Sequence, residues 1–336
     1  MPELRKDPLV GRWVIIATER ARRPGNFVDP YRSSSNEIKD SFLNDHNNNV
    51  KEVYAMKNGS SWLVKVLRID KPLLSADIEL KSRRQGLYEV LSGYGFHEIV
   101  IESSENISSM ADLSLTQIEN VLKTYVARLN EIGKDPKVQF AYIYKSYDGK
   151  VLAKSTPSYS QIVASPVIPL HIRQKLSGAK KFYEFHERCI YDDLIKQELV
   201  DRTRVINETE HFVALTPFAS RFPFEVNIFP KVTLCDFPTG IKGKEADLAR
   251  VLKDILLRFK IGLDDPAYTM VINSSPFMLN DAQLSKWRSI EDDYCWHIEI
   301  TPRLTHVAGF EKGTDFYICS IPPENTAEYL KEVELP

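Results

Sequence analysis

Apolar residues recur along this chain at two different spacings, and each spacing predicts a type of element. Strict alternation runs through 62–69 and begins again at Phe96, which is typical of β-strands with one buried face. Short apolar runs bounded by Gly, Pro or polar residues predict further strands. These strands lie at 11–17, 139–144, 162–166, 268–273 and 294–305.

Other segments follow the helical period. Ser114 and Gln117 form a capping box, and the apolar positions after it share one helix face up to Gly133. A second apolar stripe runs from Leu248 to Phe259, and such a stripe is typical of a core helix. The sequence also predicts helical structure in 171–200 and 324–330, and a loop in the Ser- and Asn-rich segment 31–52.

The order of these elements repeats weakly. Each half has an incoming strand, a long helix, another strand and a final strand that ends in proline, at Pro166 and at Pro302. We therefore predict two copies of one α+β unit, with domains at 1–170 and 171–336.

Composition narrows the choice of partners. The chain has 336 residues, 44 of them basic and 46 acidic, so no basic excess points to nucleic acid. No apolar run approaches the ~18 residues of a membrane span, and the N-terminus has no apolar segment of signal-peptide length. We expect a soluble cytoplasmic protein with no membrane partner. The four cysteines are widely spaced and are expected to be buried thiols.

Several motifs stand out against this background. A cationic cluster at 19–24 could hold phosphate. A polar approach that ends in Tyr159-Ser160-Gln161 leads into the predicted strand at Ile162, and the predicted strand 294–305 contains Trp296-His297-Ile298-Glu299. Taken with the strand around His97 and the segment 308–318, these motifs resemble the galactose-1-phosphate uridylyltransferase family, in the histidine-triad superfamily.

The resemblance covers nearly the whole chain and implies a fold and a reaction. The fold is a duplicated histidine-triad-like α+β fold with two antiparallel sheets (half-barrels), each packed with helices. The family's reaction passes a nucleotide through a histidine. In its His-x-His-x-Gln motif this chain keeps Gln161 but has Tyr159 at the nucleophile position. A phenol is mostly protonated near pH 7 and is a weaker nucleophile than imidazole.

The resemblance also implies binding roles. A nucleotide- or phosphate-binding role falls on Arg20, Arg23, Asp70, Ser146 and Ser160. A sugar-binding role falls on Phe310, Glu311 and Gly313. The implied partners are a nucleotide-sugar and a sugar 1-phosphate, and the family is also expected to form a homodimer.

Metal ligands of the relatives are replaced. The zinc positions correspond to Asp40, Leu43 and Asn106, so no cofactor is expected. His297 and Glu299 project from one face of a strand and could begin a metal site. A satisfied His–Glu pair is favoured over it because no third ligand is evident.

Three functions remain open at this point. The protein could be a nucleotidyltransferase that acts on a nucleotide-sugar and a hexose 1-phosphate or phosphate, with Tyr159 in place of the histidine. It could be a catalytically impaired homologue that binds nucleotide-sugars as a sensor or partner protein. It could also reuse the pocket for unrelated chemistry.

Overall fold

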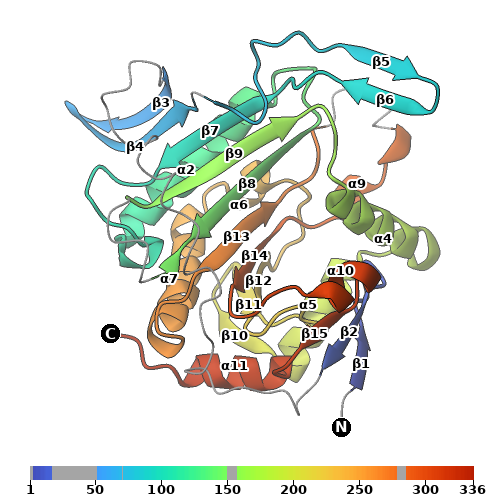
Figure 1. Cartoon of the computed structure of the whole chain (residues 1–336). Coiled ribbons are helices and arrows are strands. Elements are labelled where there is room, and N and C mark those ends of the chain that lie inside the picture. Colours follow the sequence, from blue (N-terminus) through green and yellow to red (C-terminus); the bar gives the residue numbers. More distant parts are fainter. Residues whose placement is uncertain (1–2, 17–50, 70, 150–156, 278–284) are drawn as a thin grey trace.

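The computed structural model describes residues 3–16, 51–69, 71–149, 157–277 and 285–336. Its centre is a ten-stranded antiparallel sheet in the order β10-β11-β12-β14-β13-β8-β9-β7-β4-β3 (Figure 1). The strands of the first half are β3 (Lys51–Asn58), β4 (Ser61–Arg68), β7 (Phe96–Ile101), β8 (Phe140–Tyr147) and β9 (Tyr159–Ser165). Those of the second half are β10 (Val205–Glu208), β11 (Phe212–Leu215), β12 (Val226–Pro230), β13 (Tyr268–Asn273) and β14 (His297–Pro302).

The strand order makes the two halves equivalent. Each half contributes five strands, and the order read outward from the centre matches strand by strand: β8 with β13, β9 with β14, β7 with β12. The halves join where β8 pairs with β13, with Ile143 opposite Ile272. The predicted duplication and the α+β class with antiparallel sheets are confirmed, and the two five-stranded sheets are continuous with each other.

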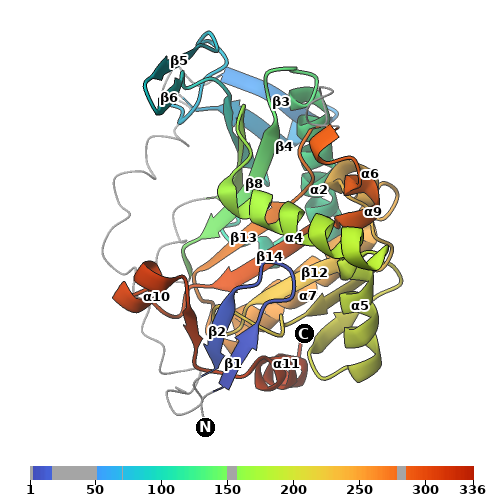
Figure 2. The ribbon, with the colours of Figure 1, turned by 90° about the vertical axis from the view of Figure 1, so that its right-hand side faces the viewer.

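Long helices cover one face of this sheet. α2 (Leu115–Ile132) and α7 (Glu245–Gly262) pack side by side behind the strands, one from each half (Figure 2). Ser114 caps α2 by accepting from the Gln117 backbone N–H, as the sequence predicts. Their buried faces meet the inward residues of both halves of the sheet in one hydrophobic core.

The opposite face of the sheet, called the outer face below, is covered over its C-terminal half. The predicted helical segment 171–200 forms two helices, α4 (Leu170–His186) and α5 (Ile190–Asp201), which pack there in a second hydrophobic cluster. The predicted domain boundary at 170/171 falls in the first turn of α4.

Smaller elements surround the sheet. β1 (Glu3–Lys6) and β2 (Trp13–Ile16) form an N-terminal hairpin, and β15 (Tyr317–Cys319) pairs with β2 in parallel. A projecting hairpin consists of β5 (Ser82–Gln85) and β6 (Tyr88–Leu91). The remaining helices are η3 (Met110–Asp112), α6 (Phe237–Ile241), α9 (Ile290–Asp293), α10 (Gly309–Thr314) and α11 (Pro323–Glu332).

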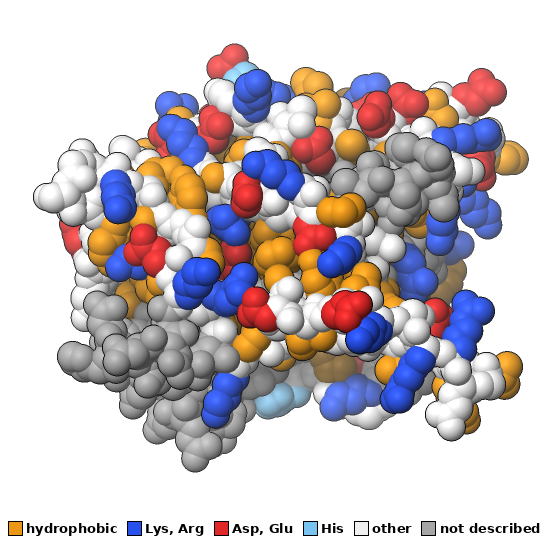
Figure 3. Space-filling view, turned by 90° about the horizontal axis from the view of Figure 1, so that it is seen from above, with side chains coloured by type: hydrophobic (Ala, Val, Ile, Leu, Met, Phe, Trp, Pro, Cys, Tyr) orange, Lys and Arg blue, Asp and Glu red, His pale blue; other side chains and the backbone are white. Residues whose placement is uncertain are grey.

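One face of the molecule shows charges of both signs mixed together. On the face in Figure 3, Lys and Arg side chains are interspersed with Asp and Glu. Within the described ranges, no helix combines the length and hydropathy needed to cross a bilayer.

Candidate functional site

Alternation along β8 and β9 places one set of polar side chains on the outer face of the N-terminal half. Tyr159 and Gln161 share this face because they are two residues apart in β9. Tyr144 lies directly opposite Gln161 in the neighbouring strand, and Ser146 is two residues beyond Tyr144 on the same side. All four side chains are half-buried. Because they share one face of neighbouring strands, the structure brings together three of the predicted site residues: Tyr159, Gln161 and Ser146.

Two hydrogen bonds fix the orientation of the Gln161 carboxamide. Its Oε1 lies 2.9 Å from the Tyr144 hydroxyl and 2.9 Å from His97 Nε2. His97 Nδ1 accepts the Leu73 backbone N–H at 3.1 Å, so Nε2 carries the proton and donates to Gln161. Since the carbonyl oxygen of Gln161 receives both donors, its amide N–H groups remain to bind an acceptor.

The same contacts decide the role of His97. Burial lowers its pKa, and both ring nitrogens are engaged in hydrogen bonds. A neutral ring in this arrangement positions Gln161 and has no free lone pair with which to attack phosphorus. His97 therefore has a structural role in this network.

Tyr159 has the environment of a protonated phenol. Burial, and then the nearby carboxylate of Asp148, raise its pKa, while Arg303 acts in the opposite direction. Arg303 in turn bonds Asp148 at 3.0 Å. A higher pKa makes the phenolate scarcer at neutral pH, so this environment disfavours Tyr159 as a nucleophile.

Ser160 points the other way. It is fully buried on the helix-covered face, where the Tyr125 hydroxyl donates to its Oγ at 2.7 Å. Its side chain cannot meet a ligand on the outer face, because adjacent residues of a strand face opposite sides. The structure thus separates the Ser160 side chain from Tyr159 and Gln161, and its expected nucleotide-binding role stays a prediction.

A buried charged network on that covered face anchors the start of β9. Lys145 Nζ lies 2.8 Å from Glu102 Oε2, 2.9 Å from Ser158 Oγ and 2.9 Å from the Tyr159 carbonyl oxygen. Lys145 and Glu102 are 2% and 0% exposed, so the pair is stable only while each partner satisfies the other. The network holds the backbone at Tyr159 in place.

The equivalent strands of the C-terminal half hold a different cluster. His297 and Glu299 share the outer face of β14, as predicted, and Lys175 of α4 reaches both of them. Its Nζ lies 2.8 Å from His297 Nε2 and 2.5 Å from Glu299 Oε1. Arg221 bonds the other Glu299 oxygen at 3.2 Å. The pair is thus satisfied by an ammonium group, which takes the position a third metal ligand would need.

Electrostatics in this second cluster follow from burial and pairing. Burial lowers the pKa of His297, whose Nδ1 donates to the Cys295 carbonyl. Burial alone would raise the pKa of Glu299, but Lys175 and Arg221 hold it well below its usual range. In the described part of the chain, no three His, Cys, Asp or Glu side chains converge as metal ligands.

The expected sugar-binding residues lie in α10, near the N-terminal hairpin. Glu311 accepts the Ala308 backbone N–H at 3.0 Å, and Phe310 is 48% exposed. A Cβ at Gly313 would meet only open space. No described contact joins these three residues to Tyr159 or Gln161, so their sugar-binding role stays a prediction.

Three expected residues, Arg20, Arg23 and Asp70, lie outside the described residues. Sequence reasoning also missed Lys145 and Lys175. A signal existed for Lys145, because it alternates with Ile143 and Tyr147 on the inward face of its strand. A charged side chain at a buried strand position predicts a buried partner of opposite charge.

Comparison with known proteins adds independent findings. No protein-family profile matches the chain. It is 31% identical over 340 residues to the ADP-glucose phosphorylase of Arabidopsis thaliana, covering 99% of this chain and 93% of that protein. It is 26% identical over 348 residues to the galactose-1-phosphate uridylyltransferase of Thermotoga maritima, covering 100% and 99%.

Similar solved structures come from the same groups of proteins as these relatives. A crystal structure of the Arabidopsis ADP-glucose phosphorylase with bound ADP-glucose superposes with a TM-score of 0.80 at 31% identity, over 100% of both chains. A uridylyltransferase structure gives a TM-score of 0.72 at 23% identity over 98% of both chains, which shows the shared fold.

Proposed function

Because this chain belongs to the galactose-1-phosphate uridylyltransferase family of nucleotidyltransferases, we propose that it binds a nucleoside diphosphate sugar on the outer face of its N-terminal half. In this proposal the Gln161 amide donates to the phosphates, and Tyr159 lies beside them without forming a covalent intermediate. The protein then acts as a nucleotide-sugar-binding homologue of the transferases.

The observation that carries the proposal is the fixed orientation of Gln161. Tyr144 and His97 both donate to its carbonyl oxygen. The amide nitrogen therefore presents two N–H donors on the half-buried outer face. Phosphate oxygens accept such donors and cannot supply them. ADP-glucose is the first ligand to test, because the relative at 31% identity is an ADP-glucose phosphorylase.

The absence of covalent chemistry rests on the environment of Tyr159. Its pKa is raised, and the histidine nearest in the hydrogen-bond network, His97, is neutral with both nitrogens engaged. Attack of the phenol on the α-phosphorus would require a base to take its proton. Among the described residues of this network, no imidazole is available for that step.

Calorimetric titration with ADP-glucose and UDP-glucose tests the binding. Gln161→Glu keeps the shape of the side chain, removes both donors and adds a negative charge beside the phosphates. We expect this change to weaken binding by about tenfold or more, since hydrogen bonds to charged groups contribute ~1.5–3 kcal/mol. Gln85→Glu, the same change on the exposed strand β5, is the matched control. Equal affinities of the two variants would refute the proposal.

Nucleotidyl transfer through Tyr159 is the second candidate function. It is favoured by the position of Tyr159, on the same face as Gln161 and two residues away. The phenol oxygen would bond the α-phosphorus, its proton would pass to a base, and the sugar 1-phosphate would leave. Intact-mass measurement after incubation with ADP-glucose would then show one added nucleotidyl group, and Tyr159→Phe would abolish it.

A further inference from the structure

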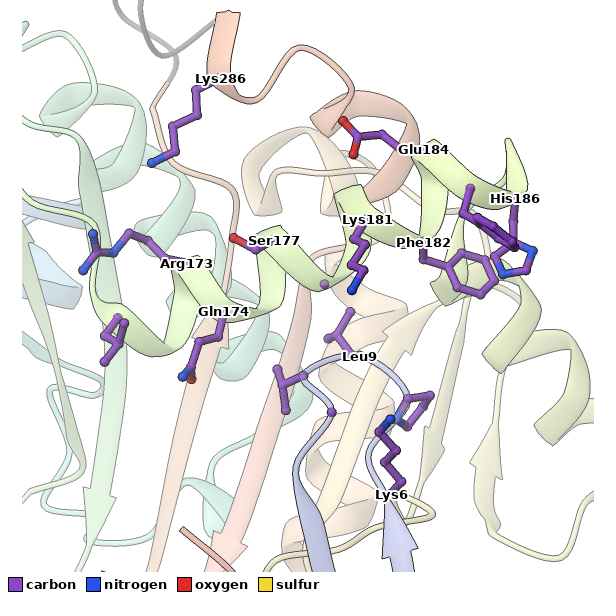
Figure 4. Close-up of a pocket in the computed structure, with 16 residues that line it drawn as sticks. Lys6, Leu9, Arg173, Gln174, Ser177, Lys181, Phe182, Glu184, His186 and Lys286 are labelled. Carbon is purple, nitrogen blue, oxygen red and sulfur yellow. The ribbon is translucent and has the colours of Figure 1, made fainter. Parts of the chain in front are cut away.

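A groove of about 1000 Å³ runs along the side of α4 that faces away from the sheet. Figure 4 shows Gln174, Ser177 and Lys181 along this helix, with Leu9 and Lys6 on the N-terminal hairpin opposite. The groove is separate from Tyr159 and Gln161, neither of which lines it. Its volume is at the upper end of that of small-molecule sites.

The groove concentrates positive charge on a chain whose net charge is −2. Four cations line it: Lys6, Arg173, Lys181 and Lys286. Within the described ranges none of the four has an ion-pair partner, and Lys6 and Lys286 instead lie over tryptophan rings at 5.9 and 5.0 Å. The carboxylate in the lining, Glu184, lies 3.7 Å from Lys180. Unpaired cations around one hollow favour an anionic ligand.

Aromatic rings gather at one end of the groove. Phe182 and Phe185 contact the His186 ring with centroids 4.2 and 4.8 Å apart, and Phe185 is 81% exposed. An exposed aromatic ring beside a cationic groove is a stacking surface for a nucleobase. Arg173 and Phe185 are twelve residues apart on α4, which corresponds to ~18 Å along the axis. That length fits a single nucleotide with extended phosphates, and it is too short for a nucleic-acid strand.

We propose that this groove is a second site, which binds a nucleoside triphosphate. The base stacks on the exposed Phe185 ring, and the phosphates extend past Lys181 toward Arg173 and Lys286. The proposal does not depend on the function of the Gln161 site. Gln174 and Ser177, on the groove side of α4, can donate to the phosphates between the cations.

Titration of the full-length protein with ATP, adenosine and inorganic tripolyphosphate tests this site, with saturating ADP-glucose present to occupy the Gln161 site. The double variant Arg173→Ala/Lys181→Ala should weaken both ATP and tripolyphosphate by about tenfold or more, because it removes two charged donors. Phe185→Ala should weaken ATP and leave tripolyphosphate unchanged. Adenosine should bind more weakly than ATP.

The matched control is Lys51→Ala/Arg83→Ala, which removes the same charges at exposed positions of β3 and β5 outside the groove. It should bind ATP like the unmodified protein, and added NaCl should weaken binding because it screens exposed charges. Equal ATP affinity in the groove and control double variants would overturn the site. If the groove double variant lost tripolyphosphate binding while Phe185→Ala left the ATP affinity unchanged, the assignment of the site to a nucleotide would be overturned.

Discussion

Tyr159 lies two residues before Gln161 on one face of β9, so a side chain at position 159 points toward a ligand held by the Gln161 amide. Imidazole has a pKa of ~6.5 and is largely unprotonated at pH 7, unlike a phenol. We therefore expect Tyr159→His to form a nucleotidyl adduct with ADP-glucose that the unmodified protein lacks, detectable by intact mass. Tyr159→Phe is the control without a nucleophile. Tight binding by Tyr159→His with no adduct would show that position 159 does not face the α-phosphorus.

Replacing Lys175 should lower the free energy of unfolding. It is 4% exposed and bonds both His297 and Glu299. Lys175→Met keeps most of the volume and removes the charge, and breaking a buried pair in this way costs ~3–5 kcal/mol. We expect about 3 kcal/mol of lost unfolding free energy in urea titration, at the low end of that range because Arg221 still bonds Glu299.

The same helix offers a matched control. Lys181→Met makes an identical change at an exposed position of α4 that has no ion pair in the described structure, and it should change the unfolding free energy little. If the two variants were equally stable, the pairing of Lys175 with His297 and Glu299 would contribute nothing measurable.

Buried and half-buried histidines predict how stability depends on pH. Burial, with nearby Lys175, lowers the pKa of His171 to about 4, and burial also lowers the pKa of His97 and His297. Below pH ~6.5 the unfolded chain binds protons that the folded protein does not, so stability should fall as the pH drops from 6.5 toward 4.

Comparing His171→Gln with the unmodified protein isolates one of these groups. The variant should show a shallower loss of the urea midpoint between pH 6.5 and pH 4. Asp293 has a pKa raised to about 6 by burial, so it stabilises the fold below pH ~3.8 and loses this effect as the pH rises through 6. That opposing contribution is common to both proteins and cancels in the comparison. Identical pH profiles would show that His171 takes up its proton in the folded state.

Some residue roles follow from sequence and others require the fold. The strand period alone puts His297 beside Glu299. Tyr159 lies beside Gln161, and Ser160 faces the opposite side, because β9 begins at Tyr159 rather than at the predicted Ile162. Lys175 is distant in sequence from both of its partners, and only the packing of α4 on the outer face brings them together.

Elements with strong local signals were predicted well. The cap at Ser114 and the apolar stripe of 248–259 correspond to α2 and α7, and the alternating segments correspond to strands. The segment 171–200 was predicted only as helical. The first of its two helices ends at Glu187, which has a left-handed backbone with φ of 53°. Glycine usually marks such a position in a sequence, and no glycine occurs here. The short helix α10 was missed because it is held by a single cap at Glu311 rather than by an apolar face.

Contact between α4 and the N-terminal hairpin depends on a glycine. A Cβ at Gly178 would lie 1.9 Å from the Leu9 carbonyl oxygen, so Gly178→Ala must push the hairpin away from the helix. Alanine favours a helix by up to ~1 kcal/mol, while such overpacking costs ~1–3 kcal/mol. We expect a net loss of unfolding free energy. Ser177→Ala, at an exposed position on the same turn, should be neutral or slightly stabilising, and equal stability of the two variants would contradict the close contact.

The whole molecule is joined through its centre rather than by a linker. The main hydrophobic core contains residues of both halves, including Ile143 and Ile162 from the first and Met270 and Ile298 from the second. The pairing of β8 with β13 continues the sheet across the midline, and α2 packs on α7. Neither half could lose its structure without exposing apolar surface of the other.

This continuity predicts that both halves unfold together. Differential scanning calorimetry should give one transition, with equal calorimetric and van't Hoff enthalpies, since two-state unfolding requires that equality. Ile143→Ala removes a side chain at the β8–β13 junction and should cost ~2–5 kcal/mol and lower the midpoint of that transition without splitting it. Ile78→Ala, at a position 44% exposed, is the control and should leave the midpoint nearly unchanged. Two separate transitions in the unmodified protein would show that the halves fold independently, as the predicted boundary at 170/171 would allow.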